Sequence, residues 1–140
     1  MISSSRKVLI VDDDSSDVFF LNRMLHRLGV DDVESVETAY DASKYMVGLL
    51  PFARRCLPNL IFVDLNMGGM SGLHFISTLK KNPLYKDISL VALSGSSDPR
   101  NKEKAMKSGA NAYYEKTIGT RNLKVTVEGA LTLDDPSIVA

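Results

Sequence analysis

The sequence predicts an α/β fold in which helices cover both faces of a parallel β-sheet. The first observation is a set of short apolar runs, such as 8–11 and 60–63, which lack the polar alternation of a strand with one solvent face. The second is that segments with helical spacing of apolar residues alternate with these runs along the chain. With 140 residues, the chain has the size of one ordinary domain and can bury a core of its own.

The first strand and helix are expected within residues 7–28. Residues 7–11 predict a strand, and residues 15–28 predict a helix because apolar side chains recur there at helical spacing. The apolar stripe of this helix consists of Phe19, Leu21, Met24, Leu25 and Leu28. Gly29 follows, and glycine suits the left-handed conformation in which many helices end.

The middle of the chain predicts two more strands with a helix between them. Residues 33–37 form a weaker strand, residues 39–49 a helix, and residues 60–64 a strongly apolar strand. The segment 51–58 begins and ends with proline and is expected to be a loop.

The second half of the chain continues the alternation. Ser71 is expected to cap a helix that runs to about residue 81, and residues 88–93 form the fourth strand. The remaining elements are a helix capped by Ser97 or Asp98, with Pro99 in its first turn and Gly109 at its end, a strand over 111–115 and a helix over 120–132.

Five strands interleaved with helices indicate a flavodoxin-like, doubly wound (βα)5 sandwich. Right-handed crossovers then give a five-stranded parallel sheet in the order 2-1-3-4-5. We expect one domain over residues 7–133, with a short N-terminal tail at 1–6 and a C-terminal tail at 134–140.

Composition excludes several classes of protein. Acidic and basic residues balance at 17 each, which argues against nucleic-acid binding and against a DNA-binding domain. Neither a membrane span nor a signal peptide is recognisable. Cys56 is the single cysteine and cannot form an internal disulfide, so a reducing, cytoplasmic location is expected.

Acidic side chains follow two of the predicted strands. Asp12, Asp13 and Asp14 follow the first strand, and Asp64 ends the third. The carboxyl ends of parallel strands form the ligand-binding edge of such a sheet, so these carboxylates are expected to share a pocket. Close like charges repel unless a cation lies among them, and Mg²⁺ prefers oxygen ligands. The acids therefore predict a magnesium site.

Two further polar side chains are expected at the same edge. Ser94 ends the fourth strand and Lys116 follows the fifth. A carboxylate nucleophile, acids that hold a metal, a hydroxyl and an ammonium are the groups that phosphoryl transfer to Asp64 requires. This chemistry depends on positioning and on neutralising charge on the phosphoryl oxygens.

These motifs resemble the receiver domain of two-component response regulators, over about residues 7–131. The matching segments are 8–13, 63–67, 69–72, 93–94, 109–113 and Lys116. Together, in this order and at the ends of the expected elements, they make the resemblance specific. Within this family, the runs 64–66, 82–84 and 109–111 are most similar to stand-alone regulators that partner cyanobacterial and bacterial phytochrome kinases.

The resemblance implies a role for each site residue. Asp64 would accept a phosphoryl group from a histidine kinase or a phosphotransfer protein. Mg²⁺ or Mn²⁺ would be held by Asp12, Asp13, Asp64 and the backbone carbonyl of Asn66, with Asp13 a more direct ligand than Asp12. Such a domain is a phosphorylation switch and not a turnover enzyme, apart from autodephosphorylation.

The resemblance also implies a route for the signal. Ser94 and Tyr113 would form a switch pair, in which Ser94 moves toward the phosphoryl group and Tyr113 turns inward behind it. The altered surface would be built from the helix that begins at Pro99, the strand over 111–115 and the last helix. The downstream protein target is not readable from the sequence.

Two residues depart from the family pattern. Gly68 stands where the family usually has proline, and this glycine is expected to free the loop beside Asp64. Thr117 replaces the usual proline after Lys116, which is expected to change how the lysine is placed.

Some residues keep two interpretations. Asp14 suits a helix cap as well as the pocket, and Ser94 suits an ordinary turn beside Gly95. Tyr113 would pack well in a core whether or not it switches.

Alternative functions also remain open. One is a receiver-like binding module that works without phosphorylation. Another is a phosphatase, for which Asp14 would be the only spare acid near the pocket. Finally, an exposed part of the last helix, which carries Leu123, Val125, Val127 and Leu131, would support a homodimer.

Overall fold

The computed structural model describes residues 6–49, 57–66, 71–116 and 120–133. In these ranges the chain forms a five-stranded parallel sheet in the order β2-β1-β3-β4-β5, which confirms the predicted topology. The strands are β1 (Lys7–Val11), β2 (Asp32–Val36), β3 (Leu60–Asp64), β4 (Ser89–Ser94) and β5 (Ala112–Glu115). The helices are α1 (Ser15–Arg27), α2 (Ala39–Leu49), α3 (Gly72–Lys80), α4 (Pro99–Ser108) and α5 (Thr120–Leu131).

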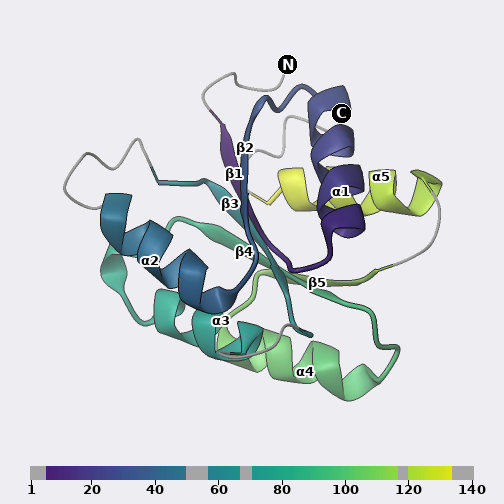
Figure 1. Cartoon of the computed structure of the whole chain (residues 1–140). Helices are drawn as coiled ribbons and strands as arrows, with labels where there is room; N and C mark the ends of the chain where they lie inside the picture. Colours follow the sequence, from purple (N-terminus) through teal and green to yellow (C-terminus); the bar gives the residue numbers. More distant parts are fainter. Residues whose placement is uncertain (1–5, 50–56, 67–70, 117–119, 134–140) are drawn as a thin grey trace.

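Helices cover both faces of the sheet, with α1 and α5 on one face and α2, α3 and α4 on the other (Figure 1). Alternate residues of a strand point to opposite faces, so β1 contributes to both cores. Val8 and Ile10 pack toward α1 and α5, whereas Leu9 and Val11 pack toward α2 and α3. All residues of β3 are buried, as expected of a central parallel strand.

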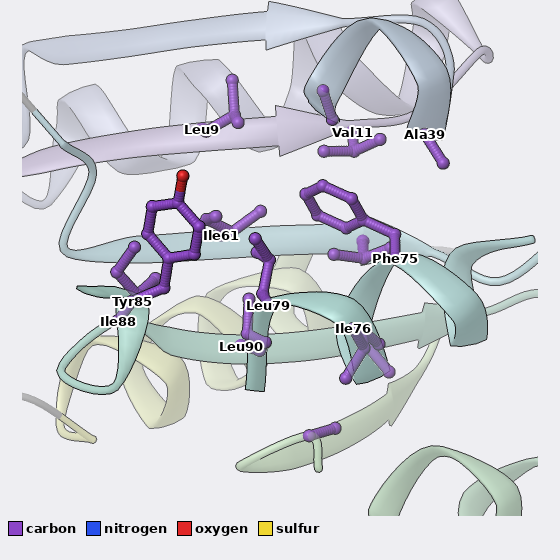
Figure 2. Close-up of a cluster of buried hydrophobic side chains, with 14 of the residues drawn as sticks. Leu9, Val11, Ala39, Ile61, Phe75, Ile76, Leu79, Tyr85, Ile88 and Leu90 are labelled. Atoms are coloured by element: carbon purple, nitrogen blue, oxygen red, sulfur yellow. The ribbon is translucent and has the colours of Figure 1, made fainter. Parts of the chain in front are cut away.

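The core between the sheet and α3 is packed with large apolar side chains. Figure 2 shows Phe75 and Leu79 of α3 between their helix and the strands that carry Val11 and Ile61. Phe75 and Ile61 are fully or almost fully excluded from solvent. Burial of this kind stabilises a fold by roughly 1.5–3 kcal/mol for each large side chain.

Short polar residues begin the helices where the sequence predicts them. Ser71 Oγ accepts a hydrogen bond from His74 N at 3.0 Å, and Asp98 Oδ1 accepts one from Arg100 N at 2.9 Å. Pro99 occupies the first turn of α4. Gly29 and Gly109 adopt positive φ values of 93° and 113° after α1 and α4. The predicted left-handed conformation of Gly29 is therefore confirmed, as is the predicted end of α4 at Gly109.

The structure corrects four details of the prediction. Phe19 was placed on the buried stripe of α1, but its side chain is 57% exposed. Two residues correspond to about 200° of helical rotation, so a face centred on Leu21 turns Phe19 toward solvent. The strands β2, β4 and β5 begin or end one residue away from their predicted bounds. A short 3₁₀ helix, η2 (Pro83–Tyr85), capped by Asn82, was not predicted.

The fourth correction concerns Arg6, which the sequence places in the N-terminal tail. The residue is buried, and its Nη1 donates a hydrogen bond to the carbonyl of Leu131 at 3.0 Å. A cation at the end of α5 is favourable because the carboxyl end of a helix carries partial negative charge.

Hydrogen bonds continue the sheet beyond the ends of its strands. Asp12 N donates to the carbonyl of Val36 at 3.0 Å, and Lys116 N donates to that of Ser94 at 2.7 Å. This register brings the residues at the carboxyl ends of β1, β3, β4 and β5 to one edge of the sheet. Among the helices that the structure describes, none combines the length and apolar character needed to cross a membrane.

Gly109 provides a test of the turn that ends α4. A Cβ atom at this position would lie 2.5 Å from Lys80 Cγ, and the φ of 113° disfavours an L-residue. We expect Gly109→Ala to lower the free energy of unfolding by roughly 1–2 kcal/mol, measured by urea denaturation. Gly48→Ala in α2 is the matched control, because its Cβ would meet no atom within 4 Å. This control should raise stability by up to about 1 kcal/mol, and a neutral Gly109→Ala would contradict the account.

Candidate functional site

Three carboxylates gather at the carboxyl edge of the sheet. One oxygen each of Asp12, Asp13 and Asp64 lies within 4.8 Å of the others. The pairing of Val11 with Val63 accounts for this, since the next residues of β1 and β3 then lie side by side. Asp12 and Asp64 are only 2% and 3% exposed, whereas Asp13 faces solvent. The predicted acidic pocket is therefore present, with one open side.

Each buried carboxylate uses one oxygen to fix the backbone that leaves its strand. Asp12 Oδ1 accepts a hydrogen bond from Asp14 N at 2.9 Å, and Asp64 Oδ1 accepts one from Asn66 N at 2.9 Å. Both contacts span two residues, as in an Asx turn. They hold the carboxylates in place and leave the second oxygen of each free of this local role.

Lys116 pairs with those second oxygens. Its Nζ lies 2.8 Å from Asp12 Oδ2 and 3.1 Å from Asp64 Oδ2. A third carboxylate, that of Asp17 in the first turn of α1, lies 2.8 Å from the same nitrogen. The side chain of Lys116 is 20% exposed, so these charge-assisted contacts are partly shielded from water.

Burial and charge shift the acid–base properties of this group of side chains. Burial raises the pKa of Asp12 to about 6, and the neighbouring charge of Asp64 adds to the effect. The contacts with Lys116 and with Asp14 N oppose this rise. Burial alone would lower the pKa of Lys116. The contacts of Lys116 with Asp12 and Asp17 and the nearby charge of Asp64 outweigh this effect and raise the pKa above its ordinary value. The lysine is therefore a fixed cation at neutral pH.

The donor set suits a hard divalent cation. Asp12 Oδ2 is buried, and the part of the chain that the structure describes offers it no hydrogen bond besides the ion pair with Lys116. In the described residues, three carboxylates (those of Asp12, Asp17 and Asp64) contact one ammonium, and the carboxylate of Asp13 lies beside Asp12 and Asp64, which leaves negative charge uncompensated. Carboxylate oxygens are the ligands that Mg²⁺, Mn²⁺ and Ca²⁺ prefer. Asp12, Asp13 and Asp64 therefore fit a metal of this class.

Ser94 lies at the end of β4 beside this pocket. The residue is fully buried, and its Oγ accepts a hydrogen bond from Ser96 N at 3.1 Å. Two longer contacts, both 3.4 Å, come from Asn66 Nδ2 and Asn101 Nδ2. Oγ is the acceptor in all three contacts, so among the described residues its own hydrogen has no acceptor. The contact with Ser96 is that of an ordinary turn, and the role of Ser94 toward a phosphoryl group stays a prediction.

Tyr113 lies on β5 next to the loop that follows Ser94. Its hydroxyl donates to the carbonyl of Ser96 at 3.5 Å, and its ring packs against the core beneath α3 and α4. The tyrosine thus has a packing role and also contacts the segment that would carry a change at Ser94. Its role as a switch stays a prediction.

Of the two interpretations that the sequence left open for Asp14, the structure shows the helix cap. Asp14 Oδ1 accepts hydrogen bonds from Ser16 N and Asp17 N at 2.9 and 3.1 Å at the start of α1. The prediction that Asp14 is the only spare acid was wrong, because Asp17 holds Lys116. The available signal was position: an acid in the first turn after β1 lies above the same sheet edge.

Three other predictions are not tested by the site. The position of the Asn66 carbonyl relative to the acids stays a prediction, although the backbone N–H of Asn66 contacts Asp64. Gly68 and Thr117 lie outside the described residues.

Asn101 is a site residue that the sequence did not indicate. It contacts Ser94 from the first turn of α4, and the tertiary structure alone brings the two residues together.

Comparison with known proteins identifies the family. A family profile described as "Response regulator receiver domain" matches residues 8–128. The chain therefore belongs to the receiver domain family of two-component response regulators. The phosphate regulon transcriptional regulatory protein PhoB of Escherichia coli is 24% identical over 96% of the chain. The chain spans 56% of the length of that relative.

Two solved structures have the same fold. The phosphorylated cyanobacterial phytochrome response regulator RcpA superposes with a TM-score of 0.79 at 25% identity, over 91% of this chain and 92% of that one. The Mn²⁺-bound response regulator Rcp1 superposes with a TM-score of 0.74 at 24% identity, over 91% and 92% of the two chains.

The raised pKa of Asp12 predicts how stability depends on pH without metal. The folded state binds this proton more tightly than the unfolded state, whose carboxyl has the ordinary value of 3.8. The contribution of Asp12 to the free energy of unfolding should therefore fall as pH rises from about 4 to about 6, by on the order of 1–3 kcal/mol. Urea denaturation of the wild type and of Asp12→Asn in the presence of a chelator measures this.

Because other acids titrate in the same range, the readout is the difference between the two curves. The stability of wild type relative to Asp12→Asn should decrease across this window and level off above it. Saturating Mg²⁺ at pH 7 should raise the free energy of unfolding of the wild type, because a bound cation favours the ionised carboxylate. Parallel curves for the two proteins in chelator would contradict the pKa shift.

Proposed function

We propose that this receiver domain accepts a phosphoryl group on Asp64 and acts as a phosphorylation switch. One observation carries the proposal: Lys116 Nζ lies 3.1 Å from the Asp64 carboxylate, beside two further acids and the buried hydroxyl of Ser94. This carboxylate lies between an ammonium and an acid cluster that is suited to a metal ion. It is therefore suited to gain an anionic phosphoryl group, because the ammonium and the metal ion would neutralise the added charge.

A divalent ion is the cofactor of this reaction in our proposal. Asp12, Asp13 and Asp64 would hold it, with the carbonyl of Asn66 as a further ligand. When bound, the ion would neutralise charge on the phosphoryl oxygens. Mg²⁺ is the proposed metal and Mn²⁺ the alternative, and the presence of Mn²⁺ in the structure of Rcp1 supports this class of ion.

The donor in this proposal is a phosphohistidine of a kinase or phosphotransfer protein. A carboxylate oxygen of Asp64 forms the new O–P bond while the N–P bond breaks, and the electron pair of that bond returns to the imidazole. Lys116 pairs with one oxygen of the transferred group, and the Ser94 hydroxyl donates to another. Hydrolysis of the acyl phosphate later returns Asp64 to its free form.

Switching would proceed from Ser94 to the surface of α4, β5 and α5. A move of Ser94 Oγ toward the phosphoryl group would break its 3.4 Å contact with Asn101 in α4. The same move would change the loop to whose Ser96 carbonyl Tyr113 donates. A phosphoryl group that favours one of two arrangements of these contacts shifts their populations.

We also propose that the protein acts as a stand-alone regulator in the cytoplasm and that the surface of α5 supports a homodimer. The match to RcpA and Rcp1 over 92% of each of those chains supports the stand-alone role. Val125 of α5 is 63% exposed and Leu123 is half-buried, whereas Val127 and Leu131 belong to the core. Only the first two of the four residues are therefore available to a second copy.

Phosphorylation is tested by incubating the protein with a small phosphodonor and Mg²⁺, followed by measurement of the intact mass. We expect the wild type to gain the mass of one phosphoryl group, labile to acid and base, and Asp64→Asn to gain none because it lacks the nucleophile. Asp41→Asn, an exposed acid in the first turn of α2, should behave like the wild type. A gain on Asp64→Asn, or none on the wild type at any Mg²⁺ concentration, would contradict the proposal.

The switch is tested with beryllofluoride, a mimic of the phosphoryl group, and NMR. Binding should shift the ring resonances of Tyr113 in the wild type, because the loop that holds its hydroxyl changes. In Ser94→Ala the shift of Tyr113 should fall by at least half, while the resonances around Asp64 still report binding. A full Tyr113 response in Ser94→Ala would remove Ser94 from the route. An absent response in the wild type would instead favour the binding module that works without phosphorylation.

A further inference from the structure

Among the described residues, Asp17 is the carboxylate partner of Lys116 Nζ that lies outside the acceptor and metal cluster. Its carboxylate is 2.8 Å from Lys116 Nζ, as short as the contact of Asp12 and shorter than that of Asp64. Asp17 does not belong to the group of carboxylates that can share a metal ion. It reaches Lys116 from the first turn of α1, across 99 residues of sequence.

The aim of the Lys116 side chain depends on such contacts. A lysine has a flexible four-carbon chain, and ordering it opposes about 2 kcal/mol of rotamer entropy. On the backbone, the N–H of Lys116 is anchored to the carbonyl of Ser94, but Thr117 follows, so no proline ring restricts the next residue. The ammonium is therefore directed mainly by the carboxylates around it.

Metal binding would change which carboxylates remain available to the lysine. A divalent ion held by Asp12, Asp13 and Asp64 would draw on two of the carboxylates, those of Asp12 and Asp64, that Lys116 contacts. Two cations that share these carboxylates repel each other. The carboxylate of Asp17 stays outside this competition and can keep hold of the ammonium.

We propose that Asp17 is a positioning residue, which holds Lys116 beside the acceptor carboxylate when the metal ion occupies the acid cluster. This inference rests on the proposed function for the step it serves, although the ion pair itself does not. The exposed side of Asp17 also lets its contact with Lys116 loosen when a phosphoryl oxygen becomes the better partner, because 41% of its side chain is in water.

A simpler role for Asp17 has to be separated from this one. An acid in the first turn stabilises a helix through the helix dipole, whatever lies opposite. Asp41 occupies the equivalent place in α2 and serves as the matched control for that effect. A dipole effect should be similar in Asp41→Asn and should not depend on Lys116.

The functional test is a double-mutant cycle on the rate of phosphorylation by a small phosphodonor at saturating Mg²⁺. Asp17→Asn should lower this rate roughly fivefold relative to the wild type, as expected for a partly exposed ion pair. In the background of Lys116→Gln, the same substitution should have no further effect. Asp17→Glu, which keeps the charge, should recover part of the rate, and Asp41→Asn should match the wild type.

A second measurement needs no phosphorylation. The ammonium resonance of Lys116, assigned by its loss in Lys116→Gln, is followed by ¹⁵N NMR as Mg²⁺ is added. It should remain protected from exchange in the wild type and in Asp41→Asn, and it should be lost on metal binding in Asp17→Asn. Protection that survives in Asp17→Asn at saturating Mg²⁺ would overturn the inference, as would an equal loss of rate in both lysine backgrounds.

The two proposals fail in different ways. If the wild type takes up no phosphoryl group, the proposed function is wrong. The lysine resonance would then still show whether Asp17 keeps Lys116 in place when the metal ion binds. If the wild type is phosphorylated but Asp17→Asn behaves like Asp41→Asn in both measurements, only the positioning role is wrong.

Discussion

Repulsion among buried carboxylates is the constraint that shapes this protein. Asp12 and Asp64 are almost fully buried, and both lie within 4.8 Å of a third acid. Two like charges at that separation repel by on the order of 3 kcal/mol at an effective dielectric constant of about 20. The fold tolerates this because Lys116 reaches both acids and because backbone N–H groups fix one oxygen of each. The negative charge that Lys116 does not neutralise can attract a divalent cation.

The sheet provides the rigidity that this arrangement needs. Strands buried on both faces place their carboxyl ends at fixed spacing, so the acids at the ends of β1 and β3 cannot move apart to relieve the repulsion. Lys116 is tied to the same frame, because its backbone N–H extends the pairing of β5 with β4. A site of this kind is pre-organised, and a cation that binds among the carboxylates relieves their repulsion.

The same frame connects the pocket with a distant surface through few contacts. Ser94 contacts α4 through Asn101, and the loop after Ser94 receives the hydroxyl of Tyr113 from β5. These contacts are long, at 3.4 and 3.5 Å, whereas the ion pairs of Lys116 are short. Weak contacts beside a strongly held site are suited to a change of arrangement, because little energy is needed to exchange them. The receiver family membership and this geometry therefore agree.

The order of the strands, the cap at Ser71 and the pocket acids Asp12, Asp13 and Asp64 could be predicted from the sequence, because apolar periodicity and the ends of parallel strands are local properties. The exposed position of Phe19 could also have been predicted, because it follows from helical rotation. The tertiary structure was needed to show that Asp14 and Asp98 are helix caps, that Asp17 contacts Lys116, and that Asn101 contacts Ser94. Local patterns show which residues share an element or an edge. Which side chain meets which across 99 residues depends on how the helices settle on the sheet, and packing alone decides that.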